Sequence, residues 1–166
     1  MLFWLGRAKE GLAVQDEIRE KGGEAIFIAC DVSKSGEVDE AVEKVITEYG
    51  KIDILFNNAG GGDGDNFPNE TDEGCERVLA VNLSGTFYMS RSVWPHMVKS
   101  GGGRIVNNSS LAAQRGFSKN MYDWVGRAPS ASYYAAKAGV DVFTRYSAGV
   151  LEGKITSGLM LLGLVK

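Results

Sequence analysis

Tyr133 and Lys137 stand four positions apart at the start of a long helix-forming segment. Residues at this spacing lie on one face of a helix, so the two side chains are expected to project side by side. A free tyrosine titrates near pH ~10 and is a poor acid or base at neutrality, but a neighbouring ammonium favours the phenolate. The pair is therefore a candidate for proton transfer, although an amphipathic surface pair has the same spacing.

Three other motifs precede this pair in the chain. Asn57–Gly60 follows an apolar run, Val81–Leu83 carries a central asparagine, and Gly103–Ser110 is a strand-like segment that ends in paired serines. In this order, and with Tyr133 after them, the motifs resemble those of the short-chain dehydrogenase/reductase family. The resemblance extends from about Leu2 to Gly149, which is nearly the whole chain.

The resemblance implies an oxidoreductase that transfers a hydride between a nicotinamide dinucleotide and a small carbonyl or alcohol substrate. Ser110 is then implied to orient the substrate oxygen, Tyr133 to exchange its proton, and Lys137 to favour the phenolate and hold the nicotinamide ribose. Asn82 is implied to shape the active-site helix and to hold a water linked to the lysine. A turn role for Ser110 and helix capping for Asn82 are the structural alternatives. A serine hydrolase is disfavoured because the sequence has no G-x-S-x-G.

The resemblance also implies a set of cofactor-binding residues. They are Arg7, Asp31, Val32, Asn58, Ala59, Gly60, Tyr133 and Lys137. Arg7 stands where NAD-preferring relatives carry an acid, so it favours NADP over NAD, unless it is a surface arginine without a specific role. Asp31 would approach the adenine, with a turn or cap role as the alternative. The small residues after Asn58 would let the backbone approach a ribose, or would form a structural turn.

The apolar patterns predict strands that alternate with helices. Strands are expected at residues 2–5, 25–30, 52–56 and 104–107, and helices at 8–21, 35–50, 71–99 and 132–151. Ser35 is the expected N-cap of the second helix, and Gly50 is its expected end. This alternation predicts a single α/β domain over residues 1–166, with a Rossmann-like, doubly wound parallel sheet and helices on both faces.

We expect this Rossmann-like domain to be incomplete at both ends. The family's first strand and its T-G-x-x-x-G-x-G loop are absent from the sequence. That strand is central in the family's sheet order 3-2-1-4-5, so its loss leaves either a gap or a direct pairing of outer strands. Residues 151–166 contain no proline, whereas the family continues there with a strand and a Pro-Gly loop, so the terminal strand is expected to be missing or altered. Residues 118–127 form an apparent insertion that either lines a substrate pocket or packs as a surface loop.

Two functions follow from these departures. The chain is either a short-chain oxidoreductase, truncated at both ends, or an inert fragment that acts at most as an interaction partner of full-length relatives. The two long helices at 71–99 and 132–151 are the expected surfaces for homo-oligomers.

Composition excludes several other classes. The pI near 5.3 and the scattered 18 Lys and Arg residues do not fit nucleic-acid binding. No segment resembles a signal peptide or a membrane span. Cys30 and Cys75 lie in dissimilar contexts, so we expect no disulfide and a cytoplasmic location. His96 is the only histidine and there is no C-x-x-C pair, so no metal site is predicted.

Overall fold

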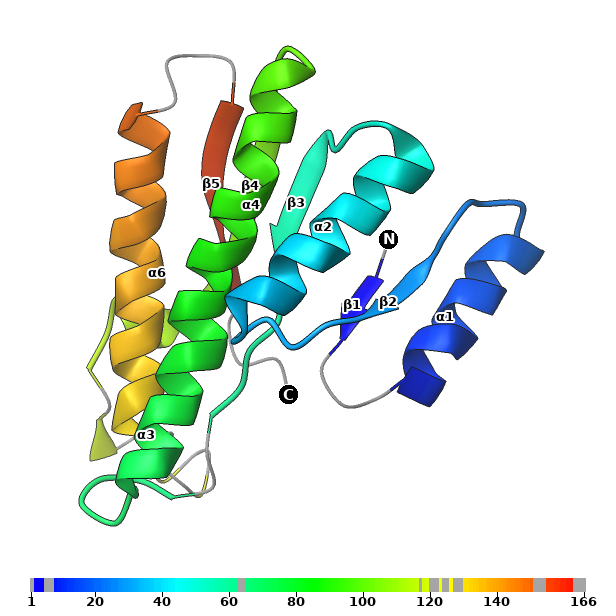
Figure 1. Ribbon diagram of the computed structural model, residues 1–166. Helices are drawn as coiled ribbons and strands as arrows, with labels where there is room; N and C mark the ends of the chain where they lie inside the picture. Colours follow the sequence, from blue (N-terminus) through cyan, green and yellow to red (C-terminus); the bar gives the residue numbers. More distant parts are fainter. Residues whose placement is uncertain are drawn as a thin grey trace.

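The computed structural model describes residues 2–4, 8–62, 65–116, 118–119, 123, 126, 130–150 and 155–162. Its strands are β1 (Leu2–Trp4), β2 (Phe27–Ala29), β3 (Ile54–Asn57), β4 (Gly103–Ser110) and β5 (Ile155–Leu162). Its longer helices are α1 (Ala8–Glu20), α2 (Ser35–Tyr49), α3 (Asp72–Leu79), α4 (Gly85–Lys99) and α6 (Ala131–Val150) (Figure 1). A π-helical turn, Ala80–Ser84, joins α3 to α4, and a 3-10 turn, Leu111–Ala113, follows β4. The predicted alternation of strands and helices is confirmed.

The ends of α2 and α3 show how local sequence sets the helix boundaries. Thr71 caps α3, since its side chain accepts a hydrogen bond from the Gly74 backbone N–H. Gly50 ends α2 as predicted, in the left-handed conformation (φ 77°) that glycine adopts without steric cost. The prediction that Ser35 caps α2 is wrong, because the N-cap position is Lys34 and it makes no side-chain cap bond.

The strands form two parallel sheets instead of one. β1 pairs with β2, while β4 lies between β3 and β5 in a three-stranded sheet. No pairing joins β1 to β3 among the described strands, so the structure has the gap that was one of the two expected consequences of a missing central strand. The terminal strand is present in altered form, because β5 pairs with β4 over its whole length without the expected proline.

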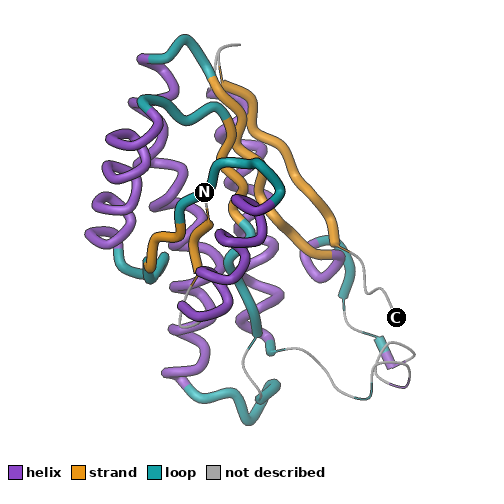
Figure 2. The backbone as a smooth tube through the Cα atoms, turned by 90° about the vertical axis from the view of Figure 1, so that its right-hand side faces the viewer, coloured by secondary structure: helices purple, strands orange, loops and turns teal. Residues whose placement is uncertain are grey.

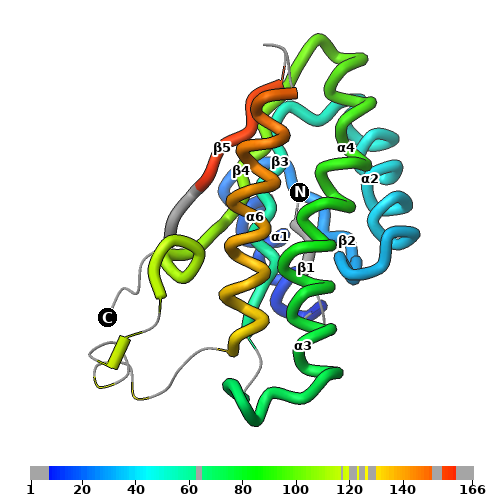
Figure 3. Tube along the Cα trace, turned by 90° about the vertical axis from the view of Figure 1, so that its left-hand side faces the viewer, coloured from blue at the N-terminus to red at the C-terminus, as the bar shows by residue number. Residues whose placement is uncertain are grey.

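One apolar core connects the two sheets. It joins side chains near β2, such as Ile28, to Leu55 on β3, Val93 on α4 and Ile105 on β4. The helices α2, α4 and α6 lie along one side of the three-stranded sheet (Figures 1 and 3), and Figure 2 shows the strands β3, β4 and β5 running together beside them. The core therefore holds the sheets in a common frame although their strands do not pair.

Helices cover the two sheets unequally. In β2, Phe27 lies against Gly11 of α1, while Ile28 joins the core on the side of α2, so this small sheet has helices on both faces as predicted. In β3, Leu55 is buried towards the helices, whereas the side chains of Ile54 and Phe56 are 61% and 46% exposed on the other face. Within the described residues, the three-stranded sheet is thus covered on one face only.

Candidate active site

The predicted proton-transfer pair lies at the first turns of α6. Lys137 Nζ is 5.6 Å from the centroid of the Tyr133 ring, so the two side chains are adjacent as expected. Lys137 is only 4% exposed, and this burial lowers the pKa of its ammonium. Its Nζ donates a hydrogen bond to the backbone oxygen of Asn108 on β4 (2.8 Å). The ammonium is thereby held at the carboxyl end of the sheet, beside a half-buried tyrosine.

Asn82 fastens the loop after β3 to the helices. It lies in the π-helical turn, is 1% exposed, and donates hydrogen bonds to the backbone oxygens of Val78 (2.8 Å) and Gly61 (2.8 Å). Its Oδ1 accepts a further bond from the Gly61 N–H (3.2 Å). A Cβ on Gly60 would lie 2.5 Å from this Oδ1 and 3.4 Å from Lys137 Nζ. Only a bare backbone fits between Asn82 and the lysine.

The paired serines at the end of β4 point in different directions. The Ser110 hydroxyl oxygen accepts a hydrogen bond from the Ala112 N–H (3.2 Å) and so caps the 3-10 turn, which is the structural alternative raised for this residue. Its O–H remains able to donate a bond. Ser109 is buried and donates to the carboxylate of Asp141 on α6. Ser110, which is half-buried, is therefore the serine available to a ligand.

The residues that follow β3 lie on the surface next to this group. Asn58, Ala59 and Gly60 are all exposed, and Asn58 Oδ1 accepts a hydrogen bond from Asn108 Nδ2 (2.7 Å). The Oδ1 of Asn108 is buried and has no hydrogen-bond partner in the described part of the chain. The tip of β3 and the tip of β4 thus present a pair of amides with unused hydrogen-bonding capacity.

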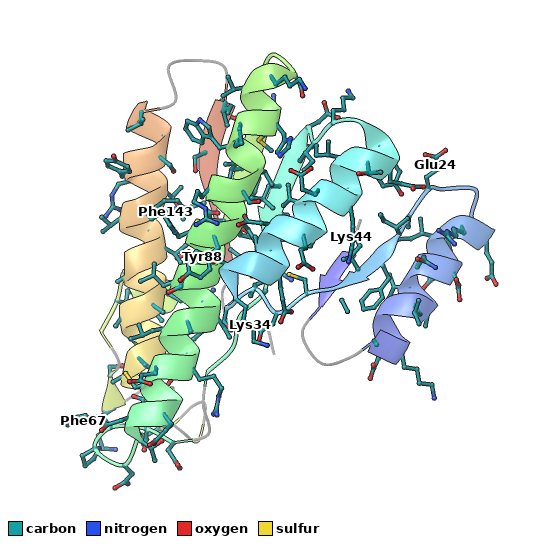
Figure 4. All side chains as sticks on the ribbon, in the orientation of Figure 1. Glu24, Lys34, Lys44, Phe67, Tyr88 and Phe143 are labelled. Atoms are coloured by element: carbon teal, nitrogen blue, oxygen red, sulfur yellow. The ribbon has the colours of Figure 1, made fainter. Side chains whose placement is uncertain are left out.

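Asp31 and Val32 follow β2 and belong to the other sheet. Asp31 accepts hydrogen bonds from the backbone N–H (3.0 Å) and the hydroxyl (2.6 Å) of Ser33, and Lys34 Nζ lies 3.6 Å from its Oδ2. Figure 4 labels Lys34 beside the start of α2. Burial pushes the pKa of Asp31 upward, but the hydrogen bonds from Ser33 and the charge of Lys34 outweigh it, so the pKa lies below its ordinary value. Val32 is buried against Gly85, where a Cβ would lie 2.9 Å from the Val32 side chain. Asp31 therefore makes the contacts of a turn residue, and its approach to the adenine stays a prediction.

Some predictions fall on residues that the structure does not describe. Arg7 lies outside the described residues, and so does most of the insertion at 118–127. Among the described residues, no group of three or more His, Cys, Asp or Glu could hold a metal ion, and no helix is long and apolar enough to cross a membrane. Cys30 and Cys75 are free thiols.

Sequence reasoning missed a buried polar network beneath the site. Asn57 Nδ2 donates to Asn107 Oδ1 (2.8 Å) and to the Ser90 hydroxyl (3.1 Å), and Asn107 Nδ2 donates to Thr144 Oγ1 (2.8 Å). Buried amides stabilise a fold only when they are hydrogen-bonded, and here the bonds connect β3, β4, α4 and α6. The available signal was one asparagine at an inward-facing position of each strand, Asn57 in β3 and Asn107 in β4.

Comparison with known proteins shows to which family this chain belongs. A family model described as short chain dehydrogenase matches residues 1–166. The chain is 34% identical over 143 residues to the 3-oxoacyl-[acyl-carrier-protein] reductase of Chlamydia pneumoniae, which covers 86% of this chain and 54% of that relative. It is 38% identical over 134 residues to the short-chain reductase protein NovJ of Streptomyces niveus, covering 81% of this chain and 47% of NovJ.

Solved structures agree with this result. A short-chain dehydrogenase/reductase from Burkholderia xenovorans superposes with a TM-score of 0.84 at 29% identity, covering 98% of this chain and 62% of that one. A xylitol dehydrogenase solved with NAD⁺ bound gives a TM-score of 0.83 at 31% identity, with 97% and 59% covered. The chain belongs to the short-chain dehydrogenase/reductase family, and it spans about half the length of the curated relatives it matches.

Proposed function

We propose that this protein is an NAD(P)-dependent oxidoreductase that acts on a small carbonyl or alcohol substrate. The observation that carries the proposal is the convergence of Tyr133, Lys137 and Asn82 on the loop after β3, next to the tip of β4. In open parallel sheets, ligands bind beyond the carboxyl ends of the strands, and this group lies there. Membership of the family and the resemblance to dehydrogenases give the reaction class.

The residues at this position fit a nicotinamide cofactor. Lys137 has donors left over after its bond to Asn108, the backbone at Gly60 is open to close approach, and the Asn58 amide is exposed. These residues would hold the nicotinamide ribose, and Asp31 with Val32 would lie towards the adenine. When bound, the nicotinamide supplies or accepts the hydride. Arg7 supports NADP as the cofactor, with NAD as the alternative.

Each catalytic residue then has a defined task. The free O–H of Ser110 donates to the substrate oxygen and stabilises negative charge as it develops there. Tyr133 gives or takes the proton of that oxygen, and the neighbouring ammonium of Lys137 favours the phenolate form. Asn82 holds the loop after β3 against the helices through its hydrogen bonds to the backbone oxygens of Gly61 and Val78.

A second function is favoured by a different observation. Among the strands that the structure describes, β1 and β3 do not pair with each other, and the sequence has no T-G-x-x-x-G-x-G motif to bind the cofactor pyrophosphate. A protein with these features could be inert in hydride transfer and act as an interaction partner of full-length relatives. Binding and turnover measurements separate the two functions.

The test uses calorimetric titration with NADPH and NADH together with a panel of carbonyl substrates. The chain alone should bind NADPH weakly and turn over little, because the phosphate-binding loop is missing. In a chimera that carries, before Leu2, a relative's first strand, its T-G-x-x-x-G-x-G loop and the helix that follows, Tyr133→Phe should lower turnover by about 100-fold or more and leave cofactor binding mostly intact. Lys137→Ala should impair both. Full turnover in the Tyr133→Phe chimera would refute the catalytic assignment, and a chimera inert towards every carbonyl would favour the interaction partner.

We also propose that the protein forms homo-oligomers through α4 and α6. These helices lie side by side (Figures 1 and 3), and Figure 4 shows Tyr88 and Phe143 on neighbouring faces of the pair. Apolar residues on their outer surface are exposed: Phe87 46%, Val98 48%, Val142 58%, Tyr146 68% and Val150 52%. A patch of this kind supports association. Light scattering that shows a monomer at every concentration would contradict it.

The two free cysteines support a reduced, cytoplasmic location.

A further inference from the structure

The amino terminus of α6 is held by a carboxylate from a distant loop. Glu70 Oε2 accepts a hydrogen bond from the backbone N–H of Ser132 (3.2 Å), and Glu70 Oε1 accepts one from the Ser132 hydroxyl. The two residues are 62 positions apart, and Ser132 is only 3% exposed. This contact attaches the loop before α3 to the residue that immediately precedes Tyr133.

The contact meets a specific need of the helix. Backbone N–H groups in the first turn of a helix have no partner within the helix, and a carboxylate is the favoured acceptor at that end. Ser132 is the second residue of α6 and its N–H is one of these groups. The Ser130 hydroxyl, which is fully buried, lies 3.3 Å from the Ser132 hydroxyl and completes the arrangement. Glu70 thus acts as a cap for α6 from outside the helix.

The same loop is anchored to the site at its other end. Gly61 is hydrogen-bonded to Asn82 through both its N–H and its carbonyl oxygen. A Cβ on Gly62 would lie 3.6 Å from the Ser130 hydroxyl and 4.0 Å from the Tyr133 Cβ, so the loop backbone contacts the start of α6. Glu70 in turn directly precedes Thr71, the N-cap of α3. Gly61 therefore bonds to Asn82, and Glu70 bonds to the helix turn that carries the tyrosine.

We propose that Glu70 is a positioning residue that fixes the first turn of α6 and thereby the orientation of Tyr133 relative to Lys137 and Asn82. Glu70 acts through Ser132 and does not touch the reacting atoms. The inference rests on the proposed function in taking Tyr133 as the acid–base group. It assigns to Glu70 a role that depends on the geometry of its two hydrogen bonds.

Three variants separate geometry from charge. Glu70→Ala removes both hydrogen bonds. Glu70→Gln can keep both, because its carbonyl oxygen accepts from the Ser132 N–H while its amide donates to the Ser132 hydroxyl oxygen. Glu73→Ala is the matched control, since Glu73 is an exposed glutamate in the first turn of α3 and has no part in the Ser132 contact. If Glu70 is a positioning residue, Glu70→Gln should retain the orientation of Tyr133 that Glu70→Ala loses.

The readout is the ¹⁹F spectrum of the whole chain labelled with 3-fluorotyrosine, which needs no turnover. The chain has six tyrosines, and the Tyr133→Phe chain identifies the Tyr133 signal by its loss. In Glu70→Ala, the Tyr133 signal should move by more than its linewidth towards the position of an unstructured tyrosine. The Glu70→Gln and Glu73→Ala signals should stay at the wild-type position.

The outcomes decide the inference separately from the proposed function. An unchanged Tyr133 signal in Glu70→Ala overturns the positioning role, as does a Gln signal that moves as far as the Ala signal. If Glu70→Ala does not fold, Glu70→Asp takes its place, because it keeps the charge and shortens the reach by one methylene. In the active chimera, Glu70→Ala should lower kcat about 10-fold with KM changed less than twofold. Turnover that survives Tyr133→Phe would refute the catalytic assignment of Tyr133 and leave the ¹⁹F result on Glu70 standing.

Discussion

Gly60→Ala should destabilise the chain, because the structure leaves no room for a methyl group at this position. The new Cβ would lie 2.5 Å from Asn82 Oδ1, a distance that real Cβ atoms essentially never show. Lys137 Nζ, at 3.4 Å, limits movement in another direction. The Asn82 side chain is 1% exposed and makes three hydrogen bonds, so it cannot rotate away from the clash without breaking some of them.

The hydrogen bonds of Asn82 set the size of the effect. Moving the Asn82 amide away from residue 60 breaks its two bonds to Gly61. A net contribution of about 1 kcal/mol for each bond gives a loss of about 2 kcal/mol, and a buried amide left without a partner raises this towards about 3 kcal/mol. The Gly60→Ala chain should therefore unfold at clearly lower urea concentration than the wild type.

Gly61→Ala is the matched control. A Cβ on Gly61 would meet no atom within 4 Å. An alanine that fits without strain should stabilise the chain by about 0.4–1 kcal/mol, because it restricts the unfolded state. The unfolded-state effect is common to both glycine-to-alanine changes, so equilibrium urea unfolding followed by circular dichroism should separate them by the clash penalty alone, about 2–3 kcal/mol.

A double variant tests the stated cause. In an Asn82→Ala background the oxygen that Gly60→Ala meets is gone, so the second substitution should cost little. Equal stability of the Gly60→Ala and Gly61→Ala chains would refute the reasoning. So would a Gly60→Ala penalty that persists in full after Asn82 has been removed, since the clash would then lie elsewhere.

Three further predictions follow from the titrating groups. Burial lowers the pKa of Lys137 in the folded chain, so the unfolded chain binds this proton more readily. The free energy of unfolding should therefore rise as the pH approaches 10.5, the ordinary pKa of a lysine. Urea titrations at several pH values should show this rise in the wild type and not in Lys137→Met. Ser33→Ala should raise the pKa of Asp31, because it removes the hydrogen bond from the Ser33 hydroxyl while the bond from the backbone N–H remains. Less stability should then be lost on acidification, and NMR titration of the carboxyl checks the pKa; an unchanged pKa would contradict this. Burial raises the pKa of the Cys30 thiol to about 11, so a thiol reagent at pH 8 should label the half-buried Cys75 first, and equal labelling rates in the folded chain would be the contrary result.

Sequence patterns were sufficient for the alternating order of strands and helices, and the roles of the site residues stay predictions. Apolar periodicity depends on near neighbours, so it located the helices and strands to within a few residues, and the left-handed end of α2 at Gly50 followed from glycine alone. The four-residue spacing of Tyr133 and Lys137 was enough to place their side chains together, because helix geometry is local. The predicted cap at Ser35 failed since a boundary shift of one residue was enough to exclude it.

The tertiary structure decided how distant segments meet. The gap between β1 and β3 depends on which strands pair, the fit of Gly60 against Asn82 depends on how the loop returns to the helix, and the bonds from Ser132 to Glu70 span 62 positions. None of these three contacts can be predicted from neighbouring residues, because the same residue types could form hydrogen bonds and pack in many other arrangements. Hydrogen bonding and packing choose among those arrangements only when the whole core has formed.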